Sequence, residues 1–250
     1  MENLYLLDVS FSGLKYKGSQ RLTQYPSIQK SIENALKKVY SQDIKTKLSS
    51  RVDAQVSALH MGVTFFEKGT LTPDKIKYVL NRALEDDIRV NEVKIVPPSF
   101  DIRKDVKSKT YLYLLNLENE NPLLNTYAFH PFFKVNLDKL KESLSWFRGQ
   151  HDFTAFISMD EEIETPFKII EDTSLEVGSH FVKIRIKGHS FGRYQVRYIV
   201  GTCLYYSCGK VSKEDIISRL EGKNKEHLGY KVPGKGLILE CIEYDESKLC

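Results

Sequence analysis

Residues 181–207 read FVKIRIKGHSFGRYQVRYIVGTCLYYS and contain two hydrophobic periodicities in succession. The first seven residues alternate, with apolar side chains at the even positions, which predicts a strand over Phe181–Lys187. The apolar residues that follow recur at helical spacing, which predicts a long helix over Phe191–Ser207. A strand that runs into a long helix indicates a fold containing both types of element.

The rest of the chain has the same two patterns. Strands are predicted at 5–11, 56–66, 88–95, 110–117, 168–177 and 236–244, and amphipathic helices at 27–40, 72–84, 137–147 and 212–220. This order predicts an α+β fold of two similar α/β halves, of the RRM or ferredoxin-like kind. We expect the N-terminal half to span 1–100 and the C-terminal half 101–250.

Composition excludes several classes of protein. The 250 residues carry 37 Lys and Arg against 33 Asp and Glu, and 41% are hydrophobic, which is typical of a globular chain. No stretch approaches the roughly 20 apolar residues of a membrane span, and the first residues do not resemble a secretory signal. The cysteines form no CxxC pair and show no zinc-finger spacing with histidine. We therefore expect a reduced cytoplasmic protein with no metal and no membrane contact.

Charge is unevenly distributed along the chain. Residues 160–176 hold seven acids and one base, whereas residues 177–213 hold seven bases and no acid. On the predicted strand, Lys183, Arg185 and Lys187 share the face opposite the apolar residues. Arg193 and Arg197 are four residues apart and share a helical face. Two interpretations remain open: a track for a polyanion such as a phosphate backbone, or a solvated sheet face with ordinary ion pairs.

Several motifs resemble one enzyme family. Residues 50–58, SRVDAQVSA, are similar to the Gly-Arg-Thr-Asp-x-Gly-Val-His-Ala signature of the TruA-type tRNA pseudouridine synthases. Residues 188–202 are similar to that family's Gly-x-x-Phe-Leu-Arg-x-x-Val-Arg-x-Ile-Val-Gly-Thr. Weaker matches occur in the family's order at Gly18-Ser19-Gln20, Leu80–Ile88, Phe100–Arg103, Tyr111-Leu112-Tyr113, Gly149–Phe156 and Pro233–Leu239. The matches span nearly the whole chain.

The resemblance implies a fold and a reaction. The fold would be a continuous antiparallel sheet across both halves, with the active site in a central cleft. The reaction would isomerise uridine to pseudouridine in RNA without a metal or cofactor. Asp53 would be the nucleophilic carboxylate, Arg197 would pair with it, and Tyr111 would stack on the uracil and handle the C5 proton. Leu237 would lie under the base and Arg51 would hold the flipped nucleotide. The remaining RNA contacts would come from Arg103, Lys183, Arg185, Lys187 and Arg193.

The chain departs from the family pattern around the nucleophile. Ser50, Val52, Gln55 and Ser57 stand where Gly, Thr, Gly and His are usual, Ser19 stands where Trp is usual, and Gly192 where Leu is usual. The family's usual substrate is the tRNA anticodon stem-loop, and its usual assembly is a homodimer. The departures leave open another tRNA position, ribosomal RNA, or an inactive RNA-binding protein of the same fold. A zinc deaminase is disfavoured, because its His, Cys and Glu spacing is missing.

Overall fold

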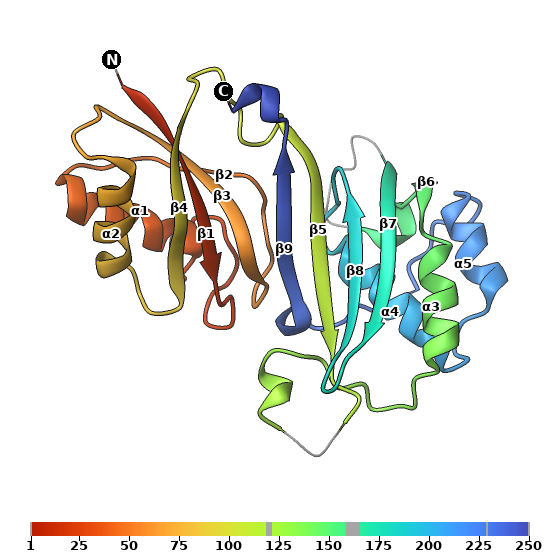
Figure 1. The fold of residues 1–250 in the computed structure, drawn as a ribbon. Helices are drawn as coiled ribbons and strands as arrows, with labels where there is room; N and C mark the ends of the chain where they lie inside the picture. Colours follow the sequence, from red (N-terminus) through yellow and green to blue (C-terminus); the bar gives the residue numbers. More distant parts are fainter. Residues whose placement is uncertain (1, 119–121, 159–165, 229, 250) are drawn as a thin grey trace. The chain divides into compact units, whose positions relative to one another are not determined.

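The computed structural model describes residues 2–118, 122–158, 166–228 and 230–249 (Figure 1). Contacts divide the chain into two compact units. The first unit contains Met1–Lys107 and Ile238–Cys250, and the second contains Ser108–Leu237. The last strand of the chain therefore belongs to the first unit. Helices and mostly antiparallel strands are present in both units, so the α+β class is confirmed.

The sheet of the first unit is built around β1 (Asn3–Phe11), which pairs antiparallel with both β3 (Ser57–Glu67) and β4 (Ile88–Val96) (Figure 1). The short β2 (Lys47–Leu48) pairs antiparallel with β3. The last strand, β9 (Leu237–Tyr244), pairs with β3 in the parallel direction. The parallel pairing of β3 with β9 thus occurs among antiparallel pairings and lies at the start of β3.

Helices α1 (Ile28–Tyr40) and α2 (Pro73–Ala83) bury one apolar face each in this unit. Ile32, Leu36 and Leu80 have no exposed surface, and complete burial of such a side chain contributes roughly 1.5–3 kcal/mol. The start of α2 follows the predicted signals. The Thr72 side chain accepts a hydrogen bond from the Lys75 amide, and Pro73 occupies the first turn.

The sheet of the second unit has the order β5 (Val106–Leu115), β8 (Val182–Gly188), β7 (Phe167–Val177) and β6 (Gly149–Asp152), and all three pairings are antiparallel. In β8 the even positions are buried and the cations are half-buried, which confirms the alternation. Strand β6 was not predicted, because four residues are too few to show a period.

Three helices complete the second unit: α3 (Leu137–Ser145), α4 (Gln195–Ser207) and α5 (Lys213–Leu220). Helix α4 is the most buried of them, with Ile199, Val200 and Leu204 inaccessible to solvent. Gly201 allows another segment to approach its surface. A Cβ atom at this position would lie 2.1 Å from the carbonyl oxygen of Tyr230, so only glycine fits.

The start of α4 differs from the prediction. The periodicity predicted a helix from Phe191, but α4 begins at Gln195. Gln195 closes a tight turn by accepting a hydrogen bond from the Gly192 amide through Oε1 (2.7 Å) and donating its own amide to the Gly192 carbonyl (3.1 Å). Tyr194 is left-handed, with φ at 64°, so the helix cannot extend back through it.

No helix in the described part of the chain is long and apolar enough to cross a membrane.

Candidate functional site

The loop that carries Asp53 lies between β2 and β3 in the first unit and is held by a second loop, Gly13–Ser19. The Val52 amide donates a 2.9 Å hydrogen bond to the hydroxyl of Ser19, and the Ser19 amide donates a 3.0 Å bond to the Val52 carbonyl. Ser19 is completely buried. Two reciprocal hydrogen bonds therefore fix the backbone one residue before Asp53, and the serine that replaces the family's Trp provides one of them.

A tight turn follows the carboxylate. The Val56 amide donates to the Asp53 carbonyl (3.2 Å), and the Gln55 amide donates to the Tyr16 carbonyl (3.2 Å). Gln55 is left-handed, with φ at 67°. The family pattern has glycine here, and a side chain in this conformation costs about 1–2 kcal/mol. Strain of this kind is tolerated where a turn must be held in one shape.

Asp53 is partly exposed and Arg51 is exposed on the same loop. Ser57, which replaces the family's His at the start of β3, accepts a 3.0 Å hydrogen bond from the Gly13 amide. The polar substitutions around Asp53 therefore strengthen the attachment of its loop to residues 13–19.

Arg103 lies in a turn after β4. Its Nε atom donates to the Leu48 carbonyl on β2 (3.1 Å). Its amide donates to Asp101 (2.9 Å), and that bond, together with the amide of Lys104, lowers the pKa of the Asp101 carboxyl below its usual range. Asp101, which replaces a His of the family motif, thus shapes the turn that presents Arg103.

Tyr111 lies on β5 in the second unit, opposite Ile186 of β8. Its ring is buried and meets Phe191 edge-to-face, with ring centroids 5.1 Å apart. Phe191 comes from the turn before α4, where the family motif also has Phe. This contact fixes the plane of the Tyr111 ring.

Arg197 lies in the first turn of α4 and is tied to the segment that ends in Leu237. Its Nε donates to the Val232 carbonyl (2.8 Å), and the Val232 amide donates back to the Arg197 carbonyl (3.4 Å). The hydroxyl of Tyr113 donates to the Pro233 carbonyl (2.9 Å). Leu237 follows a short 3-10 turn and is buried. Within the second unit, the segment from Val232 to Leu237 thus connects the predicted arginine, Arg197, with the predicted apolar wall, Leu237.

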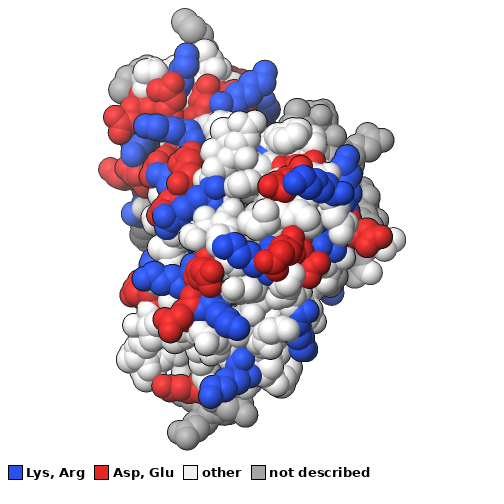
Figure 2. Space-filling view, turned by 90° about the vertical axis from the view of Figure 1, so that its right-hand side faces the viewer, with Lys and Arg blue, Asp and Glu red and all other residues white. Residues whose placement is uncertain are grey.

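The predicted cationic strand carries acids beside it. Glu176 of β7 forms ion pairs with Lys183 (3.3 Å) and Arg185 (2.9 Å), and these bonds lower the pKa of its carboxyl. Asp172 lies opposite Lys187 in the β7–β8 register. The face of the molecule drawn in Figure 2 shows blue and red residues interspersed. The ion pairs of Glu176 favour an ordinary sheet face over a continuous polyanion track for Lys183 and Arg185.

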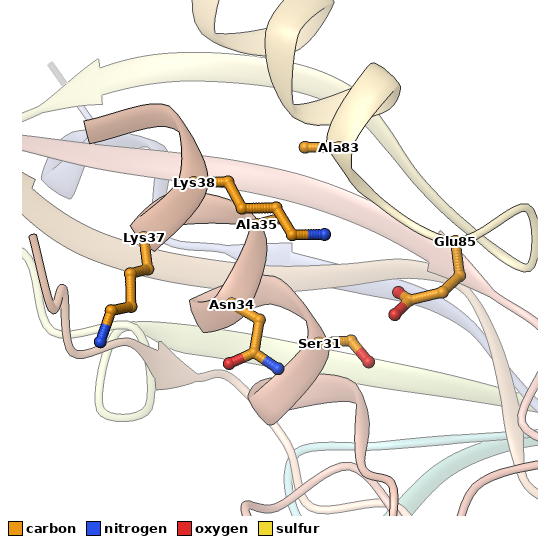
Figure 3. A pocket seen from close by; sticks show the side chains of 7 residues that line it. All are labelled: Ser31, Asn34, Ala35, Lys37, Lys38, Ala83 and Glu85. Carbon is orange, nitrogen blue, oxygen red and sulfur yellow. The ribbon is translucent and has the colours of Figure 1, made fainter. Parts of the chain in front are cut away.

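A hollow of about 460 Å³ lies in the first unit, and Figure 3 shows its lining on α1, at the end of α2 and just after α2. Its lining residues are Ser31, Asn34, Ala35, Lys37, Lys38, Ala83 and Glu85. None of them belongs to the predicted site. Among the residues that the structure describes, no group of three His, Cys, Asp or Glu side chains is arranged to hold a metal ion.

Two residues near the predicted site escaped sequence reasoning. Tyr194 has a ring that contacts three cations, and one of these is Lys231, from the polar loop after α5. Tyr194 occupies an unspecified position in the family motif, and Lys231 lies outside every motif. The cluster of aromatic and basic residues at 193–198 is a sequence signal for Tyr194 but not for Lys231.

Comparison with known proteins identifies a consistent set of relatives. A family model described as tRNA pseudouridine synthase matches residues 9–103 and 145–245. The tRNA pseudouridine synthase A of Thermoanaerobacter sp. (strain X514) is 31% identical over 245 residues, covering 98% of this chain and all of the relative. The tRNA pseudouridine synthase A 2 of Bacillus cereus (strain ZK / E33L) is 32% identical over 244 residues, covering 97% of this chain and all of the relative. An archaeal box H/ACA sRNP Nop10–Cbf5 complex includes a chain that is 13% identical, with a TM-score of 0.37 over 81% of this chain and 43% of that chain.

Proposed function

Because the chain belongs to the tRNA pseudouridine synthase family and is a pseudouridine synthase, we propose that it isomerises uridine in the anticodon stem-loop of tRNA. The observation that carries the proposal is Asp53. This carboxylate has the position of the family's acidic residue, and its loop is fixed by the reciprocal bonds between Ser19 and Val52.

The reaction breaks the N1–C1′ bond of uridine and forms a C5–C1′ bond. The C5 hydrogen leaves as a proton and N1 gains one, so the atoms of substrate and product balance without an oxidant. In the proposed sequence, the Asp53 carboxylate bonds to C1′ as the N1–C1′ bond breaks, and the uracil keeps the electron pair of that bond. This transient bond divides one difficult step into two. The uracil turns, rejoins the sugar through C5, and releases the carboxylate.

Other residues serve this chemistry. The resemblance assigns Arg197 as the partner of Asp53, a role that suits a guanidinium because an opposite charge favours a carboxylate over its acid. Tyr111 stacks on the uracil and transfers the C5 proton. Leu237 provides the apolar wall under the base. The edge contact with Phe191 supports this role for Tyr111, because it holds the ring in one plane.

RNA binding must offset the few kcal/mol that base flipping costs. Arg51 and Arg103 contribute from exposed positions in the first unit, and Arg193 from an exposed position in the second. RNA phosphates must replace the acidic side chains of β7 as partners before Lys183, Arg185 and Lys187 can contribute. We assign the working enzyme to the cytoplasm as a homodimer, which is the family's usual assembly.

The reaction provides a direct assay, because the C5 hydrogen is lost. Purified protein incubated with tRNA transcripts that contain [5-³H]uridine should release tritium to water. A matched transcript with cytidine at the anticodon stem-loop uridines should release none. Tritium release from ribosomal RNA fragments but not from tRNA would show that the substrate is ribosomal RNA. Binding of tRNA without tritium release from any RNA would show an inactive RNA-binding protein.

A further inference from the structure

The ring of Tyr194 is the centre of a group of cations in the second unit. The Nζ atom of Lys231 lies 3.7 Å from the ring centroid, and the guanidinium carbons of Arg193 and Arg197 lie at 4.8 and 5.1 Å. Arg193 also donates a 3.0 Å hydrogen bond to the Tyr194 hydroxyl. Cations at these distances are attracted by the quadrupole of an aromatic ring.

The backbone of Tyr194 is held in an uncommon conformation. Its φ of 64° is left-handed, a region that is sterically unfavourable for an ordinary side chain. The neighbouring Gly192 and Gln195 close the turn on both sides. Gly192 itself packs where a side chain would collide with Ile157, whose Cδ1 lies 2.6 Å from the position of a Cβ atom. The surroundings therefore fix the conformation that places the Tyr194 ring.

The position of Arg197 runs against a general rule for helix stability. It occupies the first turn of α4, where the positive end of the helix dipole disfavours a cation. Arg193 lies just before the same turn, and Lys231 adds a third charge. Proteins keep locally unfavourable arrangements of this kind mainly at functional sites.

Tyr194 also joins two segments of the second unit. Arg197 belongs to α4, whereas Lys231 and its neighbour Val232 belong to the segment that leads to Leu237. The segment is already bonded to Arg197 through Val232 in both directions. The Tyr194 ring adds a further contact between the two segments, because the charged ends of Arg197 and Lys231 both lie against it.

We propose that Tyr194 is a positioning residue, whose ring holds the guanidinium of Arg197 in place and sets Lys231 beside the same ring as a second cation. This inference rests on the proposed function. Electrostatic catalysis requires charges that are fixed before the reaction, because reorganising them would cost free energy in the transition state. A ring is suited to this task, since it attracts cations without neutralising them.

The first test compares Tyr194→Phe and Tyr194→Leu in the full-length protein by tritium release from tRNA. The Phe variant keeps the ring, so its kcat should stay within about threefold of the wild type. The Leu variant loses the ring, so its kcat should fall roughly 10- to 100-fold with little change in KM, as expected for a misplaced catalytic group. Equal loss in both variants, or unchanged kcat in the Leu variant, would overturn the inference.

A second test does not depend on the folding of the Leu variant. Lys231→Met keeps the aliphatic stem and removes the charge, and should lower kcat/KM about 5- to 20-fold, because one of the fixed charges is lost. Unchanged kcat/KM would contradict the role of Lys231. Tyr206→Leu is the matched control, because Tyr206 is on the same helix and its ring also lies near a lysine, Lys139 at 5.9 Å. Wild-type protein without activity on any RNA would refute the proposed function instead.

Discussion

The hydroxyl of Ser19 accepts a hydrogen bond of 2.9 Å from the backbone amide of Val52, one residue before Asp53. Both residues are buried, and the Ser19 amide returns a bond to the Val52 carbonyl. The loop that carries the carboxylate assigned to covalent catalysis is thus held by hydrogen bonds to Ser19, more than thirty residues earlier in the sequence.

Replacing Ser19 by Ala should destabilise the protein and slow the reaction. The buried amide of Val52 would lose its acceptor, which costs about 1–3 kcal/mol, and the Asp53 loop would gain freedom. We expect a lower urea midpoint and a lower kcat. Ser218→Ala is the control, because that hydroxyl donates an exposed hydrogen bond to the Asp215 carbonyl of its own helix. A Ser19→Ala protein with wild-type stability and kcat would contradict this account of the loop.

Replacing Gln55 by Gly should stabilise the fold. Glycine adopts φ near 67° without the steric cost that Gln55 bears. The larger freedom of glycine in the unfolded chain offsets part of the gain, so we expect a net increase of about 0.5–1 kcal/mol in urea denaturation. Gln55→Ala should give no such increase, since alanine keeps the strain. A glycine variant no more stable than the alanine variant would contradict the strain assigned to the left-handed backbone of Gln55.

Stability should fall at alkaline pH through buried tyrosines. Burial raises the pKa of the Tyr113 phenol above its ordinary value of 10.0, and burial does the same for Tyr244. A raised folded-state pKa stabilises the protein below the unfolded pKa, and this contribution is lost as pH rises past about 10. The free energy of unfolding measured in urea should therefore drop between pH 8 and pH 10.5. Tyr113→Phe should drop less, and an equal drop would exclude Tyr113 as a source.

Glu176→Gln decides between the two interpretations of the β8 cations. If Lys183 and Arg185 bind RNA, removal of their acidic partner should tighten tRNA binding at low salt and steepen its salt dependence, because more phosphate contacts would release counterions. Filter binding across a salt series measures both quantities. Unchanged affinity in Glu176→Gln and in Lys183→Gln would leave these cations as an ordinary sheet face.

Local patterns predicted most of the helices and strands, because each pattern depends only on residues that are close together in the sequence. The alternation in β8 and the capping signals at Thr72 and Ser212 are of this kind. The true start of α4 was missed, because the apolar period continues through Phe191 while Gln195 bonds back to Gly192. The ion pairs of Glu176 depend on the β7–β8 register, which the sequence does not state.

The candidate site was reached by resemblance and not by residue chemistry alone. An Arg and an Asp two residues apart, such as Arg51 and Asp53, are common in structural loops. Contacts such as Ser19 with Val52 and Tyr194 with Lys231 join residues far apart in sequence. No local pattern encodes them, so they emerge only when the chain is folded.

The most direct measurement of the central claim is tritium release by Asp53→Asn, with tRNA affinity determined on the same protein. Asparagine keeps the shape of the side chain but is not a carboxylate nucleophile. We predict that release falls below detection while tRNA affinity stays within about threefold, a difference under 1 kcal/mol. Asp43→Asn, at an exposed carboxylate paired with Lys37, should behave as the wild type. Wild-type tritium release by Asp53→Asn would contradict the assignment of Asp53 as the nucleophile.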